Sequence, residues 1–250
     1  MNLTTLGFAV LANAVYFDNQ PEVGGFARHL LRREDACGFH AALYVRQAEK
    51  GAEFILSFAG SELTEGAVDW QADLGFGGSR VEAGLKVLGA ISPIGYVAAN
   101  MANARAKTLF LSQKNNALSF ATLARTMARG RPLCITGHSL GGGLAQMAAA
   151  FSGLPAVTFS APAVTGVDGV RAAFVRQRPK IVNFRIANDP VNVSELAGER
   201  IGHTVTLMSP RNVAKAHLMG DTIAELMPQG QFARTGSRQP FTIAEATVNS

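Results

Sequence analysis

The stretch Pro132–Ala150, PLCITGHSLGGGLAQMAAA, decides the fold of this chain. Its apolar start meets a Gly-His-Ser-Leu-Gly motif, and the residues that follow are almost all small or helix-forming. A buried strand that passes into a helix through a serine between two glycines is typical of a nucleophile elbow. There the serine backbone is strained, and glycines at positions 137 and 141 avoid a clash. We predict that Ser139 is a nucleophile; the alternative is a Gly-rich turn with an incidental serine.

A serine nucleophile requires a base and a carboxylate that orients the base. In α/β-hydrolases these follow in the order serine, acid, histidine, with the acid after a later strand. Asp189 lies just past the predicted strand 180–186 and is the candidate acid. The alternative, Asp168, is in a Gly-rich loop away from any predicted strand end, so we favour Asp189.

Two of the five histidines follow the predicted elbow and are candidates for the base. His217 lies where a loop leads into a helix, from which its side chain can reach the elbow. His203 opens a β-like run and is the alternative, so we favour His217 as the base. The remaining three are interpreted as structural, and the one inside the elbow is expected to point away from the serine hydroxyl: His29, His40 and His138.

An acyl intermediate also requires donors for its oxyanion. One donor is the backbone N–H of the residue after the nucleophile, Leu140. The second comes from the loop after an earlier strand, and Phe58–Ser61 ends such a strand. We therefore predict Leu140 and Ser61 as the oxyanion hole.

Strands and helices alternate along the 250 residues. This rhythm predicts a mostly parallel central sheet with helices on both faces, and together with the elbow it predicts an α/β-hydrolase fold. Predicted strands cover 41–45, 53–58, 132–136, 156–160 and 180–186, with a hairpin-like piece at 203–208. Predicted helices cover the amino terminus, 142–151, 170–177, 217–227 and most of 81–129, the last interrupted near 92–93 and 113–116.

The chain reads as one domain, residues 1–227, followed by a polar tail at 228–250. Within the domain, 87–118 is predicted to be a helical cap or insertion. Segments 61–68 and 87–101 are expected to cover Ser139, because a large apolar surface beside the serine would not stay exposed to water.

Composition limits the other classes of function. Cys37 and Cys134 do not suggest a disulfide framework. No metal-binding or cofactor motif is present, so we predict neither a metal nor a cofactor. The longest apolar run, 87–99, is shorter than the ~20 residues that span a bilayer. Because the amino terminus lacks a basic signal region, we expect a protein that is cytoplasmic when made, with signal-independent secretion as an alternative.

The charge is unevenly distributed. Residues 1–100 carry 7 Lys and Arg against 11 Asp and Glu, whereas residues 101–215 carry 14 against 4. This asymmetry favours transient binding to an anionic membrane surface, with ordinary solubilising charge as the alternative. Nucleic acid is not expected as a partner, because no aromatic platform accompanies the basic residues.

These segments resemble the class 3 lipase family, the α/β-hydrolases that include fungal triacylglycerol lipases and bacterial phospholipases A1. Segments that carry the resemblance are Leu11–Tyr16, Phe58–Ser61, Asp69–Leu74, Gly137–Gly142, Thr158–Pro162, Asn188–Val191 and Ala216–Leu218. One departure is Ala59, which stands where the family usually has an arginine. This departure affects the loop of the predicted oxyanion hole but none of the three predicted catalytic residues.

The resemblance implies a lipolytic serine hydrolase acting on lipid acyl esters, either a phospholipase A1 or a triacylglycerol lipase. A serine esterase acting on other esters and a non-catalytic interaction module are the alternatives. A lipid substrate without a signal region would also fit an exported antibacterial or toxin-like effector. No particular protein partner is indicated.

Overall fold

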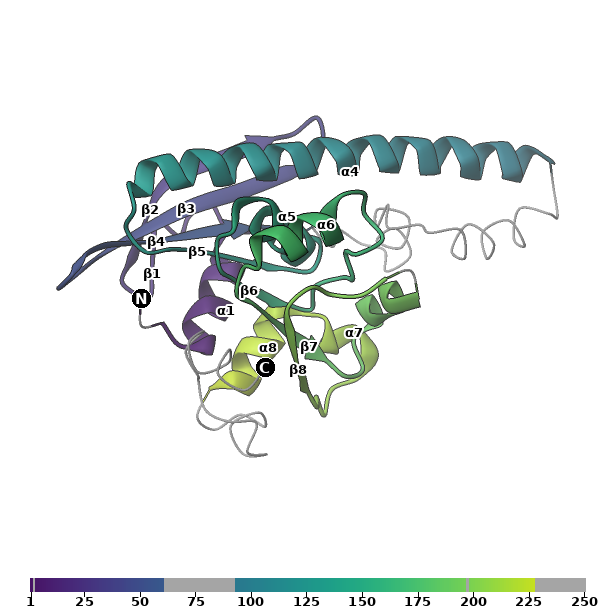
Figure 1. Ribbon diagram of the computed structural model, residues 1–250. Helices are drawn as coiled ribbons and strands as arrows, with labels where there is room; N and C mark the ends of the chain where they lie inside the picture. Colours follow the sequence, from purple (N-terminus) through teal and green to yellow (C-terminus); the bar gives the residue numbers. More distant parts are fainter. Residues whose placement is uncertain (2, 61–92, 197, 228–250) are drawn as a thin grey trace.

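The computed structural model describes residues 1, 3–60, 93–196 and 198–227 (Figure 1). In this part of the chain the strands form one sheet in the order β1 to β8. The strands are β1 (Glu22–Val23), β2 (Phe26–Glu34), β3 (Phe39–Ala48), β4 (Gly51–Phe58), β5 (Leu133–His138), β6 (Ala156–Phe159), β7 (Ile181–Ile186) and β8 (His203–Leu207). Strands β1 to β4 pair antiparallel, and β4 to β8 pair parallel.

Helices cover both faces of the sheet (Figure 1). They are α1 (Thr5–Ala14), α4 (Pro93–Ala128), α5 (Leu140–Ser152), α6 (Val170–Gln177), the 3₁₀ helix η1 (Pro190–Leu196), α7 (Val213–Ala216) and α8 (Met219–Leu226). Buried residues of α4, α5 and α6 share one cluster with the sheet, and those of α1 and α8 share the other. The predicted α/β-hydrolase fold, with its mostly parallel sheet between two helical layers, is confirmed.

The strand before the elbow is buried along its whole length because both of its faces are covered. Successive strand side chains point to opposite faces. Leu133 and Ile135 join the cluster with α4 and α5, whereas Cys134 between them joins the cluster with α1. Cys134 is a buried free cysteine, and burial raises the pKa of its thiol well above the ordinary value. The short strand β5 is thereby held between two cores at the point where it delivers the serine.

Helix α4 runs unbroken from Pro93 to Ala128, so the predicted interruption near 113–116 is wrong. Two polar residues at that point find partners without breaking the helix. Gln113 donates from its side-chain amide to Cys37 O at 2.6 Å, and Asn116 Nδ2 donates to Ser112 O at 3.2 Å. The predicted boundary of the cap at residue 118 therefore lies inside a continuous helix, and the cap itself stays a prediction.

Two further expectations differ from the structure. His203–Leu207 is not part of a hairpin, because β8 pairs parallel with β7. Strand β2 was not predicted, because its alternation is weak: two of its partly buried positions hold arginines, Arg28 and Arg32. The first segment of the predicted cover (61–68), the start of the second (87–92) and the polar tail (228–250) lie outside the described residues, whereas 93–101 lies in α4.

Candidate active site

Ser139 stands between β5 and α5 in a strained backbone conformation, with φ 56° and ψ −132°. Such positive φ values are uncommon in residues other than glycine and persist only where the surroundings impose them. Here Ser139 N donates to Phe159 O, and Gly143 N donates to Ser139 O, both at 3.1 Å. The side chain is half-buried, and its position at the start of α5 matches the predicted elbow.

Three glycines allow the elbow to pack this closely. A Cβ at Gly137 would collide with the backbone carbonyl of Gly141, and a Cβ at Gly141 would collide with the carbonyl of Phe58. At Gly142 the added atom would lie 2.7 Å from the Cβ of Ala161. The prediction that positions 137 and 141 require glycine is therefore confirmed by the backbone itself.

The structure brings Ser139, His217 and Asp189 into one hydrogen-bonded row. His217 Nε2 lies 2.9 Å from Ser139 Oγ, and His217 Nδ1 lies 2.9 and 3.0 Å from the two carboxylate oxygens of Asp189. An ionised carboxylate only accepts hydrogen bonds, so Nδ1 carries the proton and Nε2 is free to accept from the serine hydroxyl. This is the tautomer that a general base beside a serine requires.

Asp189 reaches the row from the loop that follows β7. Its side chain is fully buried, and its Oδ1 also accepts from Val191 N at 2.8 Å. The competing Asp168 is exposed, and its backbone carbonyl accepts from Lys114 Nζ at 3.3 Å. Of the two candidate acids, only Asp189 contacts His217.

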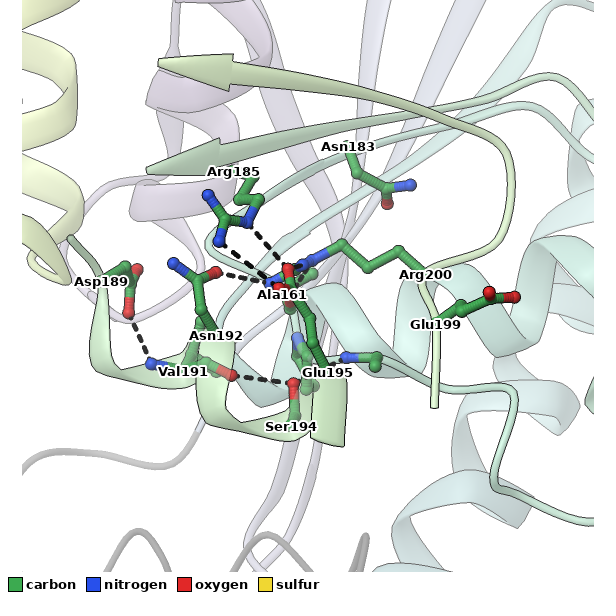
Figure 2. Close-up of polar contacts among 12 residues, drawn as sticks. Ala161, Asn183, Arg185, Asp189, Val191, Asn192, Ser194, Glu195, Glu199 and Arg200 are labelled. Carbon is green, nitrogen blue, oxygen red and sulfur yellow. Dashed lines mark hydrogen bonds and ion pairs between the residues drawn. The ribbon is translucent and has the colours of Figure 1, made fainter. Parts of the chain in front are cut away.

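A buried arginine anchors the segment that carries Asp189 (Figure 2). Arg200, whose side chain is 4% exposed, donates to Ala161 O at 2.6 Å and to Asn192 Oδ1 at 2.9 Å, and it also pairs with Glu195. Glu195 in turn accepts from Arg185 Nε at 2.7 Å. Burial disfavours the Glu195 carboxylate, but its bonds to the two arginines outweigh that effect and lower its pKa. These contacts tie η1 to β7 and to the loop after β6.

The two candidate bases lie at opposite ends of the parallel strands. His217 lies between α7 and α8, as predicted. His203 opens β8 and pairs with Val182 near the amino end of β7, whereas Asp189 follows the carboxyl end of β7. The length of strand β7 therefore separates His203 from the predicted acid, Asp189.

Two residues beside the row were not predicted to belong to the site. His138 Nε2 lies 2.7 Å from the backbone carbonyl of His217, and Tyr16 Oη lies 3.2 Å from His138 Nδ1. Burial first, and the neighbouring His217 second, lower the pKa of His138 to about 3, so it is neutral around pH 7. The hydrogen bonds of the His138 ring go to Tyr16 and to His217. Its bond to the backbone of His217 has no sequence signal, because it depends on the packing of α7.

The loop after β4 lies directly against the elbow. A Cβ at Gly60 would be 2.9 Å from Tyr16 Oη and from His138 O, and 3.0 Å from the Cβ of Ser139. Leu140 is the first residue of α5, and its N–H is one of those that a helix leaves without an intrahelical acceptor. Both features fit the predicted oxyanion hole. Ser61 lies outside the described residues, so its role stays a prediction.

Neither a candidate metal site nor a candidate membrane-spanning helix lies among the residues that the structure describes. No group of three or more His, Cys, Asp or Glu residues there is arranged to hold a metal ion. Within the same ranges, no helix has both the length and the apolar character needed to cross a membrane.

The sheet and its elbow define an α/β-hydrolase, and solved structures share this fold at low sequence identity. A triacylglycerol lipase from Penicillium expansum has 13% identity and a TM-score of 0.52, over 82% of this chain and 78% of that one. A mutant form of MDLA from Penicillium cyclopium has 16% identity and a TM-score of 0.50, over 96% and 91%. The chain covers 60% of the length of the Rhizomucor miehei lipase in its native propeptide complex.

The sequence itself matches a narrower family. Residues 102–236, more than half of the chain, match a phospholipase-like family, the Tle-like phospholipase domain family. This protein belongs to that family. The predicted relation to class 3 lipases is confirmed, and no curated protein sequence matches the chain.

Proposed function

We propose that this protein is a serine hydrolase that cleaves carboxylic acyl esters of phospholipids through Ser139, His217 and Asp189. Membership of a phospholipase-like family supports an ester hydrolase that acts on lipids. The observation that carries the serine mechanism is the row of hydrogen bonds from Asp189 through His217 to Ser139. These three side chains have the order and tautomer of a nucleophile, its base and the group that orients the base.

The distances in this row support a role for His217 in each proton transfer. As Ser139 Oγ attacks the ester carbonyl carbon, His217 Nε2 takes the hydroxyl proton and the carbonyl oxygen becomes an oxyanion. The backbone N–H of Leu140, with that of Ser61 as the second donor, stabilises this oxyanion. His217 then returns the proton to the leaving alcohol oxygen, which produces an acyl-enzyme and a lysophospholipid. Water, deprotonated by His217, releases the fatty acid and restores Ser139.

A phospholipid is favoured over a triacylglycerol on two grounds. The family description names a phospholipase, and the matched residues lie in the cationic part of the chain. Seven basic residues described there on or beside α4 and α6 are exposed to solvent: Arg125, Arg129, Arg131, Arg171, Arg176, Arg178 and Lys180. Positive charge of this density attracts an anionic headgroup layer, whereas a triacylglycerol offers no charge to attract. Export as an effector is a further part of the proposal that rests on sequence alone.

Fatty acid release from defined lipids tests this function. We expect faster release from phosphatidylglycerol vesicles than from phosphatidylcholine vesicles, and little from a triacylglycerol emulsion. A phospholipid with different acyl chains at its two positions reports which ester is cleaved. A fluorophosphonate probe should label the wild-type protein but not Ser139→Ala. Labelling together with hydrolysis of small soluble esters alone would indicate a non-lipid esterase, and absence of labelling would indicate a non-catalytic protein.

Asp189→Asn should lower turnover by roughly 10⁴-fold with little change in KM, because the amide no longer holds His217 in the required tautomer. The matched control is Asp168→Asn, which changes an exposed carboxylate outside the row and should behave as the wild type. Steady-state kinetics on phosphatidylglycerol vesicles measures both variants. Equal losses in the two variants would contradict the assignment of the acid.

A further inference from the structure

A second row of hydrogen bonds joins the predicted oxyanion loop to the predicted base from behind the elbow. Gly60 N donates to Tyr16 Oη at 2.7 Å. Tyr16 Oη lies 3.2 Å from His138 Nδ1, and His138 Nε2 lies 2.7 Å from the backbone carbonyl of His217. The row therefore starts beside Ser61 and ends on the residue that contacts Ser139 Oγ. It joins residues that are far apart in the sequence, from residue 16 to residue 217.

The chemistry of the two ends sets the direction of every bond in this row. A carbonyl oxygen only accepts, so His138 carries its proton on Nε2 and leaves Nδ1 as an acceptor. The Tyr16 hydroxyl therefore accepts from the N–H of Gly60 and donates to His138, whose Nδ1 at 3.2 Å is a nearer acceptor than its backbone carbonyl at 3.5 Å. Because burial keeps His138 neutral, with its pKa lowered to about 3, this arrangement of protons is retained around pH 7.

We propose that Tyr16 and His138 are positioning residues: they hold the predicted oxyanion loop, through Gly60, and His217 in fixed positions relative to Ser139. This inference rests on the proposed function of the Ser139 site. It assigns Tyr16 and His138 no contact with substrate. Their effect passes through the N–H of Gly60 on one side and the backbone of His217 on the other.

The surrounding packing makes such a role physically effective. Tyr16 follows α1, and α1 is fixed to β4 by the buried bond from Ser57 Oγ to Leu11 O at 3.0 Å. The rings of His138 and His217 lie 4.9 Å apart between centroids. Gly60 approaches the elbow so closely that a Cβ there would lie 3.0 Å from that of Ser139. In a site this close-packed, a displacement of about 1 Å can cost 10²-fold in rate.

Tyr16→Phe tests the proposal by removing one hydroxyl and keeping the ring. We expect kcat on phosphatidylglycerol vesicles to fall by about 10- to 100-fold, with KM within about twofold and thermal unfolding little changed. Tyr44→Phe is the matched control, because Tyr44 is fully buried in the same core cluster and forms no bond in the row. Its kcat should match that of the wild type. Equal kinetics in Tyr16→Phe and wild type would overturn the proposal.

Variants of His138 separate positioning from simple filling of space. Gln supplies an N–H for the His217 carbonyl and an oxygen for the Tyr16 hydroxyl, whereas Leu supplies neither. His138→Gln should therefore retain more kcat than His138→Leu, at similar KM. Because one row transmits both effects, the double variant Tyr16→Phe/His138→Leu should be no slower than the slower single variant. Additive losses in the double variant would contradict a shared row. Equal losses in the Gln and Leu variants would contradict a positioning role of His138 even if Tyr16→Phe failed to fold.

The failure of this inference can be distinguished from failure of the proposed function. If the wild-type protein reacts with a fluorophosphonate at Ser139 but Tyr16→Phe reacts equally fast, only the positioning role is wrong. If the wild-type protein does not react, the serine mechanism is wrong and the inference is refuted with it.

Discussion

Ser139→Ala is expected to fold as the wild type does and to lose at least about 10³-fold, and up to about 10⁶-fold, of its turnover. The loss follows from removal of the only atom proposed to attack the ester. The fold should persist because alanine keeps the serine Cβ and the contacts that impose the positive φ are made by the backbone. Fatty acid release from phosphatidylglycerol vesicles measures turnover, and thermal unfolding measures the fold.

Ser160→Ala is the matched control for this prediction. Ser160 follows the neighbouring strand β6, also has a positive φ of 46°, and its buried Oγ has no hydrogen-bond partner among the described residues. Loss of that hydroxyl should therefore leave turnover near the wild-type value. Appreciable turnover in folded Ser139→Ala would refute the assignment of the nucleophile. A large loss in Ser160→Ala, without a loss in Ser139→Ala, would indicate that turnover requires Ser160, which follows β6.

His217→Ala is expected to cause a loss comparable to that of Ser139→Ala, because base and nucleophile act as one unit. Without Nε2 at 2.9 Å from Ser139 Oγ, no side chain of the row can take the hydroxyl proton. Reaction with a fluorophosphonate should slow in parallel, since labelling also requires an activated serine. Both rates can be measured on one preparation.

His203→Ala is the control for the base. His203 opens β8 at the end of the parallel strands opposite to Asp189, so its removal should leave most of the activity. The reverse result, an active His217→Ala with an inactive His203→Ala, would mean that the histidine of the working enzyme comes from β8.

Much of the site could be predicted because its signals are local. The elbow is contiguous, and its two glycines are required by contacts within one turn and with one neighbouring strand. Asp189 was found from its place directly after an apolar strand. Both rules depend on short segments whose conformation follows from side-chain size and burial.

The failures have one cause: partners far away in the sequence changed what a local pattern allowed. Polar residues near 113–116 predicted a break, but Gln113 in α4 bonds to the carbonyl of Cys37, which lies before β3. The alternation of β2 was weak because Arg32 faces α4 and donates to Asn116 Oδ1 at 2.9 Å. The polarity of these residues indicated exposure, whereas the fold supplies partners for them.

The sequence by itself determined the class of this protein: an α/β sheet, a serine at an elbow and an acid after a later strand. His217 was already favoured over His203 from the sequence; the tertiary structure supplies a physical reason, because it places the two histidines at opposite ends of the parallel strands. Only the tertiary structure revealed Tyr16 and His138 behind the nucleophile. Their hydrogen bonds join residues 44 to 122 positions apart, and such distances are closed by the packing of whole helices on the sheet.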